Sequence, residues 1–151
     1  MSVPRAHPED LRVGPSHWGL AWVALTAAFA LHVLDEASNN FLAVYNPAAQ
    51  NLRQRWPFLP LPSLTFEGWL TALVIALLVL LMLSPLAFRR ARWLRPLSWL
   101  YGVAMLANGM GHLVGSFYLG RPMPGASSAP LLLLCASYLV WALARSPNQD
   151  S

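Results

Sequence analysis

The sequence has no lysine, a single cysteine and few charged residues of either sign. Charged residues make up 11% of the 151 residues, hydrophobic residues make up 56%, and the mean hydropathy is +0.46. Soluble domains carry about 25% charged residues, so this composition excludes an ordinary soluble protein and indicates a membrane protein. The ten basic residues, all arginine, form no patch interleaved with exposed aromatic residues, and we therefore expect no nucleic-acid binding.

The lone cysteine, Cys135, limits the chemistry that the chain can carry. A single thiol excludes an intrachain disulfide and a Cys-x-x-Cys metal or redox site. The candidate site residues are histidine, carboxylate and amide side chains.

Four apolar segments each approach the roughly 20 residues that a helix needs to cross a hydrocarbon core of about 30 Å. We predict spans at 18–38, 66–88, 97–118 and 128–145. They form one membrane domain, 17–146, between a polar N-terminal tail, 1–16, and a C-terminal tail, 147–151. The predicted fold is all-α, a four-helix transmembrane bundle.

The loop between the first two predicted spans carries a helix signal of its own. Asn46-Pro47 is typical of an N-cap followed by proline at the first helical position, and Pro57 would end such a helix. Polar residues surround Leu52 and Trp56 in this segment. We therefore predict a short amphipathic helix at 47–56, lying along the membrane surface in the first outer loop.

Arginine placement predicts the orientation. Arg89, Arg90, Arg92 and Arg95 lie between the second and third predicted spans and assign this loop to the cytoplasm by the positive-inside rule. With four spans, both termini are then cytoplasmic. We expect an integral protein of a bacterial inner (plasma) membrane, with the lipid bilayer as its main partner. Gly111 and Gly115 form a small-x-x-x-small face that suits an oligomer contact.

Polar residues inside apolar segments are costly and are candidates for function. His32 and Glu36 are one helical turn apart, and Asp35 projects from a neighbouring part of the same face. His32 and His112 each lie about fifteen residues past the inner end of their span, or about 22 Å at 1.5 Å per residue. The two histidines are therefore expected at the same depth in the outer half of the membrane.

The predicted metal ligands are His32, Asp35, Glu36, Glu67 and His112, and the candidate ions are Zn, Fe and Mn. The predicted catalytic or orienting groups are Asp35, Glu67 and Asn108, the last one turn before His112. Structural roles stay open for the same residues. Asp35 and Glu36 would then lie in water at the interface, Glu67 would stabilise a helix N-terminus, and the histidines and Asn108 would link helices.

The residues leave three functions open. The first is an intramembrane, metal-dependent enzyme acting on a small lipophilic substrate by oxidation, hydrolysis or isomerisation. The second is a non-enzymatic module that transports or senses metal ions or protons, and the third is a membrane scaffold. The sequence does not decide whether the protein is an enzyme.

His32-Val33-Leu34-Asp35-Glu36 resembles the signature of the HXXEE-motif membrane proteins, with aspartate in place of the first glutamate. His112 resembles the second characteristic histidine of that family. Met123-Pro124-Gly125 retains the Pro-Gly of the family's Y-x-P-G motif, while Pro122 occupies the tyrosine position. The resemblance runs from the first span into the fourth and implies a small multi-span protein whose function is not established.

Overall fold

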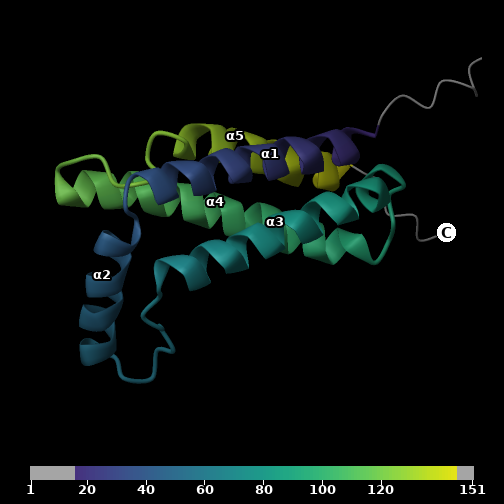
Figure 1. The fold of residues 1–151 in the computed structure, drawn as a ribbon. Helices are drawn as coiled ribbons and strands as arrows, with labels where there is room; N and C mark the ends of the chain where they lie inside the picture. Colours follow the sequence, from purple (N-terminus) through teal and green to yellow (C-terminus); the bar gives the residue numbers. More distant parts are fainter. Residues whose placement is uncertain (1–15, 146–151) are drawn as a thin grey trace, which may run out of the picture.

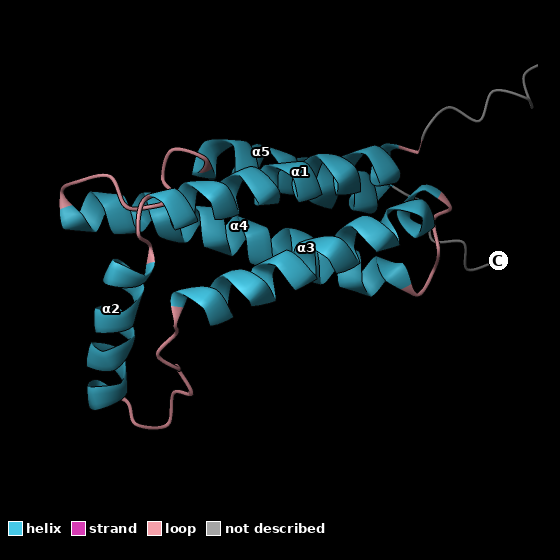
Figure 2. Cartoon of the chain, in the orientation of Figure 1, coloured by secondary structure: helices cyan, strands magenta, loops and turns pink. Residues whose placement is uncertain are grey.

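The computed structural model describes residues 16–145, which contain five helices and no strand. The helices are α1 (His17–Ser38), α2 (Leu42–Arg55), α3 (Phe66–Phe88), α4 (Leu94–Leu119) and α5 (Ala129–Arg145). Loops alone connect them (Figure 2). The four long helices occupy the predicted ranges to within three residues at each end.

Hydrogen bonds at the helix ends explain several of these bounds. The Ser16 side chain accepts from the backbone N–H of Gly19 and caps α1, and Thr65 accepts from Gly68 and caps α3. Such caps satisfy backbone donors that the first helical turn leaves unpaired. α4 ends at Gly120, which has φ +62° and therefore leaves the helical conformation without a Cβ penalty.

The long helices run alternately up and down, so that both ends of the described chain lie at the same end of the bundle (Figure 1). α1 is the central helix and packs against α3, α4 and α5. Its inward face supplies much of the core, namely Trp18, Ala21, Trp22, Leu25, Ala28, Phe29 and Val33. The indole N–H of Trp22 donates to the Leu80 carbonyl at 2.9 Å and ties α1 to α3.

By length and composition, two helices within residues 16–145 are sufficient to cross a membrane, α1 and α3. α4 is longer, at 26 residues, but it contains Arg95, Asn108 and His112 as well as four glycines. α5 is apolar but has only 17 residues. The fold is all-α as predicted, and two of the four predicted spans meet this test.

The helix predicted in the first outer loop begins five residues earlier than expected. α2 begins at Leu42, so Pro47 lies inside the helix rather than at its first position. Proline is tolerated there because the carbonyl it leaves unbonded belongs to the exposed Ala43. Asn46, predicted as the N-cap, instead bonds both the N–H and the carbonyl of Leu64 and fastens α2 to the segment before α3.

Close contact between α4 and α5 uses glycines other than the predicted pair. A Cβ at Gly109 would lie 2.8 Å from Leu133 Cγ, and one at Gly102 would lie 2.9 Å from Val140 Cγ2. A Cβ at Gly111 would meet nothing within 4 Å. The Gly111 position therefore plays no part in packing within the described chain, and its use in an oligomer stays a prediction.

We expect Gly109→Ala to destabilise the fold by about 1–3 kcal/mol, because overpacking at α5 outweighs the gain in helix propensity. Gly111→Ala is the matched control, since the same change in open space should stabilise by up to about 1 kcal/mol. Thermal unfolding of the two purified variants measures the difference. Equal melting temperatures would contradict this account of the α4–α5 contact.

Candidate metal centre

Three buried side chains from two helices come together near the C-terminal ends of α1 and α4. His32 and Glu36 lie one turn apart on α1, and His112 reaches them from α4. Glu36 Oε1 is 3.0 Å from His112 Nε2 and 3.7 Å from His32 Nε2. The side chains of His32, Glu36 and His112 are only 0%, 6% and 4% exposed. We call these three residues the His–Glu–His cluster.

The cluster leaves two buried nitrogens without a hydrogen-bond partner, His32 Nε2 and His112 Nδ1. Without an ion, the Nε2–H of His112 can donate to Glu36, while the carboxylate offers no proton to the Nε2 lone pair of His32. An ion bound at Nε2 of His112 would take the place of that proton, which a neutral imidazole can carry on Nδ1 instead. Unpaired polar atoms and buried charge are costly away from water, more so in a membrane. A bound cation would satisfy both the lone pair and the carboxylate.

The donor set fits a divalent metal ion. One ligand atom from each residue lies within 4.8 Å of the other two. Tetrahedral ligands about 2 Å from an ion lie about 3.3 Å apart, and the two measured N···O distances bracket that value. Two imidazoles and one carboxylate also form a ligand set used by catalytic zinc sites, which keep a fourth position open.

Gly125, in the loop between α4 and α5, closes over the two imidazoles. A Cβ at this position would lie 2.7 Å from His112 Nδ1 and 2.9 Å from His32 Cε1. Its φ of +89° also favours glycine. The rings beneath it meet edge to face, with their centroids 4.6 Å apart. The Pro-Gly element noted in the sequence therefore forms the lid of the cluster.

Asp35 is directed away from the cluster and toward the start of α5. Its Oδ2 accepts from Ser127 Oγ at 2.8 Å, from the Ser128 backbone N–H at 3.0 Å and from Ser128 Oγ at 2.7 Å. Its Oδ1 accepts from Asn39 Nδ2 at 2.8 Å. Ser128 Oγ in turn lies 2.8 Å from His32 Nδ1. Asp35 is therefore linked to His32 through Ser128, and it does not belong to the three-residue group that could hold a metal.

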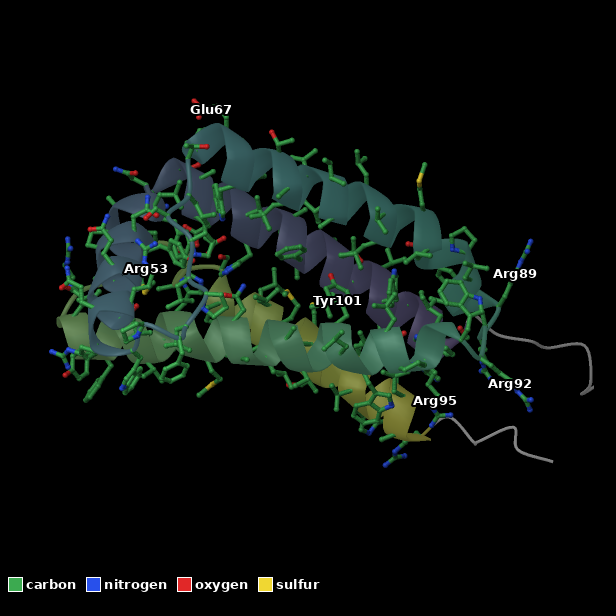
Figure 3. All side chains as sticks on the ribbon, turned by 90° about the horizontal axis from the view of Figure 1, so that it is seen from below. Arg53, Glu67, Arg89, Arg92, Arg95 and Tyr101 are labelled. Carbon is green, nitrogen blue, oxygen red and sulfur yellow. The ribbon has the colours of Figure 1, made fainter. Side chains whose placement is uncertain are left out.

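The other predicted site residues lie outside this group. Glu67 is exposed in the first turn of α3, at the edge of the bundle (Figure 3). A carboxylate at that position is stabilised by the helix dipole, as the structural alternative proposed. Asn108 is half-buried on α4 and does not belong to the three-residue group that could hold a metal. The roles predicted for Glu67 and Asn108 stay predictions.

Sequence reasoning missed Ser127, Ser128 and the closing position of Gly125. The serines precede Ala129-Pro130, a sequence typical of a helix start, and were read only as the beginning of a span. A hydroxyl at a helix N-terminus is a common cap, so no pattern marked it as part of a site. The retained Pro-Gly element was the one available signal for the loop.

Comparison with known proteins identifies a family for the chain. No curated protein and no solved structure matches the chain. A family model described as "Protein of unknown function with HXXEE motif" matches residues 22–140, which include His32, Asp35, Glu36 and His112. The match covers most of the sequence, and the chain therefore belongs to the HXXEE-motif family of proteins of unknown function.

Proposed function

We propose that the chain is a four-span membrane protein that holds a divalent metal ion in the His–Glu–His cluster and uses it on a small lipophilic substrate. The buried cluster with its unpartnered nitrogens is the observation that carries the proposal. Zn, Fe and Mn are the candidate ions.

The exposure of α3 supports a lipid environment. α3 is the most apolar of the helices, yet only Trp69 and Ala87 are buried within it. A core helix of a soluble protein would bury such a surface, because each exposed apolar side chain costs about 1.5–3 kcal/mol in water. α4 and α5 pack beside α1 and also expose apolar side chains outward, so they belong in the same layer as α1.

The distribution of charge supports the predicted orientation. Arg89, Arg92 and Arg95 gather at one end of the bundle, while Arg53 and Glu67 lie at the other (Figure 3). The arginine-rich end is cytoplasmic in this proposal, and the cluster then lies toward the outer side of the membrane. α2 runs across the direction of the long helices at that outer end, as expected of a helix on the membrane surface (Figure 1).

An open, mainly apolar pocket near the cluster supports a lipophilic substrate. Its volume is about 720 Å³, and its lining includes Leu113 and Phe117 of α4 and Ala126 of the lid loop. Leu113 follows His112 directly, and Ala126 follows Gly125. A molecule dissolved in the bilayer could occupy this pocket, beside the loop that carries Gly125.

The chain's own residues define what the site can do. A divalent ion would act as a Lewis acid on an oxygen of the substrate. His32, Glu36 and His112 would hold it, and the surrounding helices and Gly125 would exclude water. The substrate's apolar part would lie against Leu113 and Phe117, outside the cluster.

The metal content of the purified protein tests the proposed ion site. Elemental mass spectrometry on the detergent-purified protein should find one equivalent of Zn, Fe or Mn. The double variant His32→Ala/His112→Ala should lose it, because a single carboxylate cannot retain the ion. His17→Ala is the matched control, since His17 lies at the exposed start of α1 and should leave the metal content unchanged.

Absence of metal from the wild-type protein, even after reconstitution with each ion, would contradict the proposal. The cluster would then link helices, and the double variant should lose only about 1–2 kcal/mol of stability.

Cysteine labelling tests the number of membrane spans. In a Cys135→Ser background, single cysteines are introduced by Arg53→Cys, Arg92→Cys and Arg121→Cys and are labelled in intact cells with a membrane-impermeant maleimide. Four spans predict labelling at positions 53 and 121 and protection at position 92. A chain in which α1 and α3 alone cross the membrane would protect position 121, and that result would refute the four-span arrangement.

A further inference from the structure

Ser128, the residue before α5, hydrogen-bonds to two side chains of the HXXEE motif on α1. Its hydroxyl oxygen lies 2.8 Å from His32 Nδ1 and 2.7 Å from Asp35 Oδ2. His32 and Asp35 come from α1, whereas Ser128 directly precedes α5. The three side chains form a continuous chain of hydrogen bonds that ends at the cluster.

The direction of these bonds follows from the number of protons available. A serine hydroxyl has one proton to donate and two lone pairs to accept with. An ionised Asp35 can only accept, and it already accepts from Ser127, Asn39 and the Ser128 backbone. The Ser128 hydroxyl also lies 3.1 Å from the Gly125 carbonyl, which likewise can only accept, and the shorter bond to the charged Asp35 takes the proton. The hydroxyl is left as an acceptor toward His32, so Nδ1 of His32 carries the proton.

This assignment explains why His32 Nε2 is unpartnered. A neutral imidazole with its proton on Nδ1 has a lone pair on Nε2, and Nε2 is the atom that faces Glu36. Metal-binding histidines in proteins are commonly oriented through the ring nitrogen that does not bind the ion. The arrangement at His32 has that form.

We infer that Ser128 and Asp35 are positioning residues that fix the ring and the tautomer of His32 so that Nε2 is ready to bind a metal; this inference rests on the proposed function. The two acidic positions of the motif then have separate roles. Glu36 would contribute a ligand, and Asp35 would orient the Ser128 hydroxyl that accepts a hydrogen bond from His32. Because Ser128 begins α5, the ligand geometry also depends on the docking of the last helix against the first.

Ser128→Ala tests the inference with Ser127→Ala as the matched control, because Ser127 bonds Asp35 but not His32. We measure Zn²⁺ affinity by competition with a chromophoric chelator. Ser128→Ala should weaken Zn²⁺ binding about 10–100-fold, the usual effect of removing an orienting partner of a ligand. Ser128→Thr should restore affinity because it keeps the hydroxyl, and Ser127→Ala should bind as the wild type does.

Nitrogen-15 NMR of histidine-labelled, metal-free protein gives a readout that requires no metal. In the wild type, His32 should carry its proton on Nδ1, with its signals assigned by their loss in His32→Ala. In Ser128→Ala, this preference should disappear. A wild-type His32 protonated on Nε2 would overturn the inference, as would a Ser128→Ala protein with unchanged Zn²⁺ affinity and an unchanged tautomer.

The two failures are distinguishable. A wild-type protein that binds no Zn²⁺, Fe²⁺ or Mn²⁺ contradicts the proposed function, whereas the tautomer of His32 in that same protein still decides whether Ser128 orients the ring. If Ser128→Ala does not fold, the wild-type NMR spectrum and the Ser128→Thr affinity together decide the inference.

Discussion

The burial of Glu36 is the constraint on which the rest of this structure depends. A carboxylate among apolar helices is expensive, and its cost is reduced only by charge or hydrogen-bond donors held close to it. Two imidazoles meet that need, one from the preceding turn of α1 and one from α4. The imidazole from α4 joins that helix to α1 at Glu36, and the loop that carries Gly125 closes over both rings.

The helices and the loop around the carboxylate are closely packed. The loop between α4 and α5 passes so close to the imidazoles that only glycine fits at its nearest point, and α5 approaches α4 closely enough to require glycine there as well. α3 differs, because it packs on one side of α1 and leaves most of its surface open. The close contact of α4 with α5 therefore differs from the packing of α3, which contacts α1 as extensively as α5 does but is otherwise exposed.

The sequence predicted the all-α fold and the proximity of His32, Glu36 and His112 for physical reasons that can be named. Helix periodicity places His32 and Glu36 on one face, and the rise per residue places His112 at their depth. Depth along the bundle does not give the direction of a side chain, however, and Glu67 is exposed at the edge of the bundle. Ser128 and Gly125 act through loop conformation, which has no periodicity to read. The start of α2 was misplaced because an exposed carbonyl tolerates a proline that usually marks a first turn.

The cluster is assembled from α1 and α4, and Ser128 contacts it from the residue before α5. During synthesis, α1 emerges long before α4 and α5, and its buried face has few partners until they arrive. The polar groups of the site must therefore remain in a wet or shielded environment while the chain is incomplete. The complete site therefore exists only once α4 and the start of α5 have packed against α1.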